Sequence, residues 1–311
     1  MTAARARHVE DHGRPAGETG LFCDLHVHST ASDGTTAPQD LPELARAAQL
    51  TAIALTDHDT TDGLADCAAA AERIGLAFVP GIEISADPGP PPSSPATSPI
   101  RRGTLHILGL FVTANDAQLK QIQNRMRAAR NSRNPAIVEK LNQLGVAIDY
   151  EEVLELARAE GTQIIGRPHI ADVLTRRGYA NSVQNAFSRY LCQGAPAYVR
   201  RDRLPAAHAI DAIHHAGGLA VMAHPVQLVR GDGFQLEQHV RRLKDIGLDG
   251  IETLHSDHTP DEVEFFEDLA TRYGLVTSGG SDFHGTRKPV ALGSQQVPLA
   301  VYERLQEKRR A

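Results

Sequence analysis

Side chains that commonly bind metal ions follow several short apolar segments of the chain. They are His26, His28, Asp57, His58, Glu83, His106, His224, Asp282 and His284. Residues two apart on a strand point to the same face, so His26 with His28, and Asp282 with His284, can each present two ligands to one site. Burial in a hydrophobic core would explain a single histidine of this kind. It does not explain a possible ligand after nearly every apolar segment. The spacing therefore predicts a multinuclear metal site.

Seven short apolar segments are expected to be strands, and they are separated by helical patterns. The strands are expected at residues 21–28, 51–56, 77–84, 105–112, 219–223, 250–254 and 275–278, and the helices at 41–48, 64–74, 206–215, 236–246 and 261–273. Alternation of strand and helix is typical of a parallel α/β sheet with right-handed crossovers, and about seven such units suggest closure into a barrel. In such a barrel the loops after the strands form the active site, which is where these ligands fall.

Two segments interrupt this alternation. Residues 87–102 are rich in Pro and Ser, so we expect an exposed, mobile loop without a catalytic role. Residues 113–204 have apolar residues at helical spacing, which predicts an inserted helical subdomain that caps the substrate. The barrel would then consist of residues 21–112 and 205–311, after a disordered N-terminal extension at residues 1–20.

The composition narrows the class of protein. The chain has 311 residues, 41% of them hydrophobic, and a formal net charge of -6, which argues against binding to long duplex nucleic acid through a basic surface. The three cysteines form no CxxC pair, so we expect neither a disulfide framework nor a thiolate zinc site. No run of about 18 apolar residues predicts a membrane span, so we expect a cytoplasmic protein. Composition leaves the oligomeric state open.

Six sequence motifs resemble those of the PHP (polymerase and histidinol phosphatase) phosphoesterase family. They are DLHVHSTASDG at 24–34, TDHDTTDG at 56–63, GIEIS at 81–85, HILGLF at 106–111, AHP at 223–225 and GGSDFHG at 279–285. The GRPHIA motif at 166–171 and the helical insertion resemble its branch of nucleotide phosphatases and short-RNA 5′ exonucleases, often labelled TrpH-like. The resemblance implies a distorted (β/α)7 TIM-like barrel that hydrolyses phosphate esters with a metal-activated water.

The resemblance also implies three sets of ligands for a trinuclear site. The first is His26, His28, Glu83 and Asp282, the second is Asp33, His58 and His284, and the third is Glu83, His106 and His224. Glu83 would bridge two ions. Imidazole and carboxylate ligands without thiolate suit Mn2+, Fe2+ or Zn2+, and the family likeness favours two or three ions of Mn2+ or Fe2+.

Several other side chains are expected to act on the substrate. Arg167, His169 and Arg200 could bind a phosphate that the metal ions do not reach, since a guanidinium forms a planar fork of donors. His255 follows an expected strand and could donate a proton to the leaving oxygen. Asp57 could orient His58 or the attacking water, although it could equally cap the following helix.

The net negative charge favours a mononucleotide or a short oligonucleotide as substrate, because a long nucleic acid needs an extended basic surface. We therefore expect a nucleotide 3′,5′-bisphosphate similar to pAp, or the 5′ end of short RNA, with histidinol phosphate as the alternative. A metal-dependent amidohydrolase also begins with HxH, but it commonly needs a modified lysine on a middle strand, and the first lysine of this chain is Lys120. A nonenzymatic PHP scaffold is a third possibility, but it should have lost ligands that this chain retains.

Overall fold

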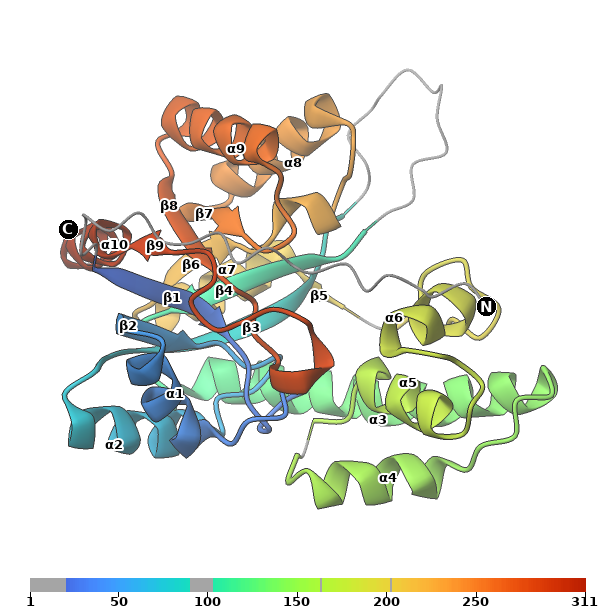
Figure 1. Cartoon of the computed structure of the whole chain (residues 1–311). Coiled ribbons are helices and arrows are strands. Elements are labelled where there is room, and N and C mark those ends of the chain that lie inside the picture. The colour runs from blue at the N-terminus through green and yellow to red at the C-terminus, as the bar shows by residue number, and fades with distance from the viewer. Residues whose placement is uncertain (1–20, 90–102, 163, 202) are drawn as a thin grey trace, which may run out of the picture.

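The computed structural model describes residues 21–89, 103–162, 164–201 and 203–311 of the chain. The expected N-terminal extension, residues 1–20, and most of the Pro-rich segment, residues 90–102, lie outside the described residues. Within the described part, a sheet lies at the centre and helices surround it (Figure 1). None of the described helices is long and apolar enough to cross a membrane.

The described residues form a sheet of nine strands in the order β8-β7-β6-β4-β3-β2-β1-β9, with β5 paired to β3. The strands are β1 (Phe22–Val27), β2 (Leu50–Leu55), β3 (Ala77–Asp87), β4 (Leu105–Leu110), β5 (Leu204–Pro205), β6 (Leu219–Met222), β7 (Gly250–His255), β8 (Val276–Gly280) and β9 (Val297–Pro298). All seven segments that the sequence predicts to be strands are strands. The two-residue strands β5 and β9 are too short to show a periodic pattern, and the sequence does not predict them.

The sheet closes on itself between β1 and the residues that follow β8. The backbone N–H of Asp282 donates to the carbonyl oxygen of His26 at 2.9 Å. The N–H of His28 donates to the carbonyl oxygen of Phe283, also at 2.9 Å. Val27 and Phe283 form an additional parallel bridge. These bonds complete the distorted TIM-like barrel.

The direction of β4 departs from the predicted parallel arrangement. β4 is antiparallel to both of its neighbours, β3 and β6, whereas the β1–β2, β2–β3, β6–β7 and β7–β8 pairs are parallel. The physical reason lies in the length of the connection, because only residues 88–104 separate β3 from β4, whereas antiparallel neighbours need no long crossover. The reversed direction brings the first residues of β4, including His106, to the end of the barrel where the other strands finish.

Helices surround the barrel or cover its ends. They are η1 (Pro38–Asp40), α1 (Leu41–Ala47), α2 (Leu64–Ile74), α7 (Ala206–His215), η3 (Pro225–Gln227), α8 (Gly233–Asp245), α9 (Pro260–Tyr273), η4 (Gly285–Arg287) and α10 (Leu299–Arg310). Local sequence sets their ends, as α9 illustrates. Thr259 and Glu262 form a capping box at its start, and Gly274 ends it in the left-handed conformation with φ of 59°.

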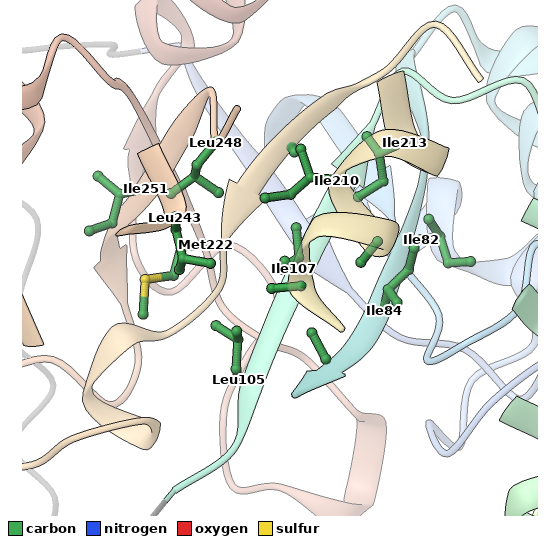
Figure 2. Close-up of a cluster of buried hydrophobic side chains, with 14 of the residues drawn as sticks. Ile82, Ile84, Leu105, Ile107, Ile210, Ile213, Met222, Leu243, Leu248 and Ile251 are labelled. Carbon is green, nitrogen blue, oxygen red and sulfur yellow. The ribbon is translucent and has the colours of Figure 1, made fainter. Parts of the chain in front are cut away.

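The main hydrophobic core lies between the sheet and these helices. Ile82 and Ile84 of β3 and Ile107 of β4 contribute to it, together with Ile210 and Ile213 of α7 (Figure 2). Successive residues of a strand point to opposite faces. The outward packing of these isoleucines therefore directs the alternate positions on β3 and β4 into the barrel.

A second cluster of hydrophobic residues fills the inside of the barrel at the end away from these alternate polar positions. It includes Leu108 and Leu110 of β4 together with Val301 and Leu305 of α10. α10 thus covers that end of the barrel, and the other end is left for polar side chains.

The segment between β4 and β5 is helical, as the sequence predicts. It contains α3 (Ala117–Gln143), α4 (Tyr150–Ala159), α5 (Arg167–Arg176), α6 (Val183–Ala186) and the π-helical turn η2 (Phe187–Leu191), and it extends to one side of the barrel (Figure 1). α3 belongs to two cores, because Leu119 and Met126 pack in the barrel core, and Ile137 and Leu141 in a separate core of the helical segment. α3 therefore links the two parts.

Candidate metal centre

Six strands bring imidazole and carboxylate side chains to the same end of the barrel. The contributing positions are His26 and His28 on or after β1, His58 after β2, Glu83 on β3, His106 on β4, His224 after β6, and Asp282 and His284 after β8. Two of these residues have an unusual backbone, since φ is 25° at His224 and 56° at Asp282. Positive φ values are uncommon in residues other than glycine and are concentrated at functional sites.

Glu83 lies at the centre of this group and is fully buried. Its Oε1 lies 2.8 Å from Nδ1 of His106 and 2.8 Å from Nε2 of His224, and its Oε2 lies 2.7 Å from Nδ1 of His58. Burial alone would raise the pKa of the Glu83 carboxyl, but His58, His106 and His26 hold this pKa well below its usual range. Glu83 is therefore an ionised carboxylate that can bind through both oxygens.

His26, His28 and Asp282 form a compact part of the same group. Nε2 of His26 lies 3.1 Å from Nε2 of His28, and Oδ1 of Asp282 lies 3.5 Å and 3.3 Å from these two atoms. Two ring nitrogens and a carboxylate oxygen thus converge on one point.

Asp33 and His284 meet His58 on the other side of His28. Oδ1 of Asp33 lies 3.3 Å from Nε2 of His284, and Oδ2 lies 3.8 Å from Nε2 of His58. Burial would raise the pKa of Asp33, but His58 and His284 lower it well below the usual range. This carboxylate is also ionised.

The residues fit divalent metal ions. The possible ligand atoms form five overlapping groups of three or four residues. Within each group the atoms lie within 4.8 Å of one another, and together the groups include all nine predicted ligands. Among the described residues, Nδ1 of His58 and Oε2 of Glu83 are buried without a hydrogen-bond partner although they lie 2.7 Å apart. Two lone-pair donors that face each other in this way suit a shared cation better than a hydrogen bond.

The grouping differs in part from the ligand sets implied by the family resemblance. His26, His28 and Asp282 form one group, and Asp33, His58 and His284 form another that also includes His28. The expected third set is divided, because Glu83 is grouped with His58 and His106 and separately with His26 and His224. Glu83 is shared by both of these groups, which is the position required of a bridging ligand.

Glu252 is a buried member of the site that the sequence analysis misses. It lies on β7, and its Oε1 is 3.1 Å from Nδ1 of His26. Burial would raise the pKa of Glu252, but His26 and His255 hold it down, at about 2. His255 shares a group of possible ligand atoms with His26 and Glu252, and its Nε2 lies 3.6 Å from Oδ2 of Asp282.

Asp57 does not join the ligand groups. Its Oδ1 accepts hydrogen bonds from the backbone N–H of Ser29 at 2.8 Å and from the Ser32 hydroxyl at 2.5 Å, and its Oδ2 accepts from the Ser29 hydroxyl at 2.6 Å. Both oxygens are thus occupied by the loop after β1. Asp57 fixes the segment that carries Asp33 instead of facing the ligand atoms.

The three residues predicted to bind substrate lie in different environments. Arg167 donates through Nη1 to the carbonyl oxygen of Leu191 at 3.0 Å. His169 is fully buried, and its Nδ1 accepts the N–H of Gly166 at 3.1 Å, so it caps the start of α5. Arg200 has a side chain that is 78% exposed, and it lies 3.9 Å from Asp87. Of the three, Arg167 is half-buried and lies near other arginines.

Three further arginines, which the sequence analysis does not select, lie close to Arg167. Asp59 accepts hydrogen bonds from Nη2 of Arg130 at 2.6 Å and from Nη1 of Arg201 at 3.2 Å. Arg133 donates to the Asn134 amide oxygen instead of a carboxylate. Its burial, together with repulsion from Arg130, Arg167 and Arg201, lowers the pKa of Arg133 well below the usual value. We call Arg130, Arg133, Arg167 and Arg201 the arginine group.

The loop after β8 contacts both the metal-ligand residues and the helical segment. Lys288 forms an ion pair through Nζ with Oδ2 of Asp282. Arg287 donates through Nη1 to the carbonyl oxygen of Asp33 at 2.6 Å and through Nε to Asp172 of α5 at 2.8 Å, and it also pairs with Glu160. Arg287 thus ties the helical segment to the loop that carries Asp33.

These features agree with a comparison against protein families. The family model described as the PHP domain matches residues 24–190, which is more than half of the chain. The chain belongs to the PHP domain family.

Three relatives of this PHP protein have named activities. A 3′,5′-nucleoside bisphosphate phosphatase of Chromobacterium violaceum is 33% identical over 84% of the chain and 86% of its own length. A 5′-3′ exoribonuclease of Haemophilus influenzae is 34% identical over 84% and 89%. A phosphoribosyl 1,2-cyclic phosphate 1,2-diphosphodiesterase of Eggerthella lenta is 35% identical over 84% and 94%. All three names describe cleavage of a phosphate ester.

Solved structures agree with the fold over nearly the whole chain. A protein of Bifidobacterium adolescentis, to which metal-dependent phosphoesterase activity has been ascribed, has a TM-score of 0.81 and 31% identity, covering 94% of this chain and 97% of its own. A protein of Chromobacterium violaceum named as an amidohydrolase, with bound sulfate and no metal, has a TM-score of 0.80 and 31% identity, covering 93% and 97%.

Proposed function

We propose that this PHP protein is a metal-dependent phosphoesterase that acts on nucleotide 3′,5′-bisphosphates or on the 5′ end of short RNA. The observation that carries this proposal is the set of nine imidazole and carboxylate ligands arranged in overlapping groups around Glu83. The activities named for the relatives support the same class of reaction.

We propose two or three divalent ions, with Mn2+ or Fe2+ preferred and Zn2+ compatible with the donors. In the sets implied by the family resemblance, His26, His28, Glu83 and Asp282 would hold the first ion, Asp33, His58 and His284 the second, and Glu83, His106 and His224 the third. In support, Nε2 of His28 lies 3.3 Å from Oε2 of Glu83, and Nδ1 of His106 and Nε2 of His224 each lie 2.8 Å from Oε1 of Glu83. When bound, such ions supply Lewis-acid activation of water and neutralise the charge of phosphate oxygens.

The arginine group supports a substrate with a second phosphate. It brings four guanidinium groups together, and Asp59 is the carboxylate that Arg130 and Arg201 contact. Burial of cations is costly unless anions compensate their charge. A phosphate accepts charge-assisted hydrogen bonds from such groups, so Arg167 and Arg133 suit the phosphate that is not hydrolysed. We propose that His169 supports this region by capping α5, and that Arg200, at its exposed edge, contacts longer substrates.

We propose that residues 113–204 cap the substrate. The helical segment supplies Arg130 from α3 and Arg167 from α5, and Arg287 anchors it to the barrel through Asp172. A segment that contributes cations and is tied to the metal-ligand loop can enclose a short anionic substrate. A long duplex is not the expected substrate of such a site.

His255 is our candidate for protonating the leaving oxygen. Its Nδ1 accepts the backbone N–H of Asp257 at 3.0 Å, so the proton of the neutral ring lies on Nε2. Nε2 is buried without a hydrogen-bond partner among the described residues, and it lies 3.6 Å from Oδ2 of Asp282. Asp57 would contribute indirectly by holding the loop of Asp33. The three free cysteines are consistent with a cytoplasmic enzyme.

The name of one structural neighbour raises the alternative of amide hydrolysis. The described strands contain no lysine that could be modified to bridge two metal ions, and Glu83, which belongs to two of the ligand groups, would take the bridging position. The geometry therefore favours the phosphoesterase.

Product analysis tests the proposal. The protein would be incubated with Mn2+ and, in parallel, with pAp, short 5′-phosphorylated RNA, a cyclic ribose phosphate, histidinol phosphate, and a panel of amides and lactones. We expect phosphate release from pAp, or mononucleotides from RNA, to be fastest. If histidinol phosphate or the cyclic phosphate were turned over faster, that compound would take the place of pAp and RNA as the proposed substrate. Turnover of an amide or lactone alone would overturn the phosphoesterase proposal. A metal-loaded protein without activity on any compound would indicate a scaffold.

A further inference from the structure

Glu252 contacts two of the nine predicted ligands, one on β1 and one after β6, and is not itself one of the nine. Its side chain is fully buried on β7. Oε1 lies 3.1 Å from Nδ1 of His26, which β1 carries, and Oε2 accepts the backbone N–H of His224 at 2.7 Å. A single carboxylate therefore spans β1, β7 and the end of β6.

The contact with Glu252 determines which nitrogen of His26 is free. An ionised carboxylate only accepts hydrogen bonds, so Nδ1 of His26 must carry the proton that it donates. The neutral ring then has its lone pair on Nε2. Nε2 is the atom that faces the centre, 3.1 Å from Nε2 of His28 and 3.5 Å from Oδ1 of Asp282.

The contact with His224 restrains a strained backbone. His224 has φ of 25° and ψ of 67°, a conformation that costs about 1 to 3 kcal/mol unless its surroundings enforce it. The hydrogen bond from its N–H to Glu252 fixes the peptide, while its side chain places Nε2 2.8 Å from Oε1 of Glu83. Loss of this bond would release a residue that reaches the proposed bridging ligand.

We infer that Glu252 is a positioning residue that presets two ligands, by holding His26 in the tautomer with a free Nε2 and His224 in its strained conformation. This inference rests on the proposed metal-dependent function. It assigns to Glu252 an effect on metal affinity instead of direct contact with the substrate.

The chemistry requires a carboxylate at this position. Both partners of Glu252 are donors, and a carboxylate has two acceptor oxygens. Glutamine has the same shape but a single acceptor oxygen, so its NH2 group would face either the N–H of His224 or Nδ1 of His26. The first arrangement opposes two donors, and the second favours the His26 tautomer with a proton on Nε2. Either arrangement disturbs one of the two candidate ligands.

The test compares Glu252→Gln with Asp249→Asn. Asp249 is a matched control, because its Oδ2 also accepts from a histidine ring, Nε2 of His214 at 2.7 Å, and from a β6 backbone N–H, that of Ala220 at 2.9 Å. Asp249 immediately precedes β7, at the opposite end from the candidate ligands. Metal content per chain and affinity for Mn2+ would be measured by elemental analysis and chelator competition, and folding by circular dichroism.

We expect Glu252→Gln to remain folded and to weaken affinity for at least one ion by about 10 to 100-fold, whereas Asp249→Asn retains wild-type affinity. Wild-type stoichiometry and affinity in Glu252→Gln would overturn the inference, as would an equal loss in Asp249→Asn. Failure of the wild type itself to bind metal would instead refute the proposed metal-dependent function, which keeps the two ideas separate.

A second measurement applies if Glu252→Gln fails to fold. In zinc-loaded wild-type protein, a long-range 1H–15N spectrum should show His26 with a proton on Nδ1 and the metal on Nε2. A proton on Nε2 would contradict the inference.

Discussion

Asp59 provides a direct test of how the helical segment is attached to the barrel. Asp59 follows β2, and its carboxylate is fully buried. It accepts hydrogen bonds from Nη2 of Arg130 at 2.6 Å, from Nη1 of Arg201 at 3.2 Å and from the backbone N–H of Ser85 at 2.9 Å. Both arginines come from the helical segment, whereas Asp59 and Ser85 belong to the barrel. Asp59→Asn keeps the shape of the side chain but removes its charge.

The expected cost follows from burial. The side chains of Arg130 and Arg201 are 10% and 8% exposed, so solvent screens their charges little. Removal of one partner from a buried ion pair costs about 3 to 5 kcal/mol, because the remaining charges stay buried without compensation. An exposed pair that also joins α3 to the segment after β2 provides the matched control. Asp62 and Arg127 form a 2.9 Å ion pair with side chains 40% and 32% exposed.

The assay is urea unfolding at pH 7 with chelator present, so that metal binding does not contribute to stability. We expect Asp59→Asn to lower the free energy of unfolding by about 3 kcal/mol or more. Asp62→Asn should lower it by less than about 1 kcal/mol, as is typical of exposed pairs. Equal, small losses in the two variants would refute the view that Asp59 anchors the helical segment through buried charge.

Further predictions concern the metal centre, the substrate and local stability. Glu83→Ala should stay folded but lose metal and phosphate release by orders of magnitude; near-native metal content and turnover would show that Glu83 does not bridge. Arg167→Lys should raise KM for pAp by a factor corresponding to about 1 to 3 kcal/mol, and change hydrolysis of p-nitrophenyl phosphate much less; equal losses on both would remove Arg167 from substrate recognition. Asp116 caps α3 by accepting the N–H of Leu119 at 3.0 Å, so Asp116→Ala should cost about 1 kcal/mol in unfolding experiments at pH 7. That N–H and other donors lower the pKa of Asp116 in the folded chain, so its stabilisation is present above the unfolded pKa of about 3.9; the difference from wild type should therefore shrink as pH falls below that value, and a constant difference would contradict this origin. Burial and the neighbouring Asp24 raise the pKa of Cys23 to about 12, so a thiol reagent at pH 8 should modify the partly exposed Cys192 first, as mass spectrometry can determine.

The sequence predicts the strands and the barrel well, because hydrophobic periodicity is a local property. It fails for the direction of β4, which depends on what connects two strands. The alternation that packs Ile82, Ile84 and Ile107 outward also directs Glu83 and His106 inward, so these two candidate ligands could be predicted from spacing alone.

The residues that the sequence analysis misses depend on tertiary packing. Glu252 lies inside the apolar segment 250–254, which the sequence predicts to be a strand. A carboxylate in the middle of a buried strand is the signal that could have identified it. In the sequence, Arg130 and Arg133 resemble solvated helix residues. Arg130 follows Met126 by four residues and Arg133 precedes Ile137 by four, so both lie on the buried face of α3. The side chain of Arg201 is 8% exposed and that of Arg200 is 78% exposed, a difference between neighbouring arginines that the sequence does not signal.

The central claim is that the ligands around Glu83 form a metal centre that hydrolyses phosphate esters. Titration of metal-stripped wild-type protein with Mn2+, while phosphate release from pAp and bound metal per chain are recorded together, tests it most directly. The account predicts that release rises from background in parallel with metal binding and reaches a plateau when the sites are filled. Phosphate release that is equally fast in the presence of excess chelator, or metal binding without any hydrolysis of a phosphate ester, would contradict it.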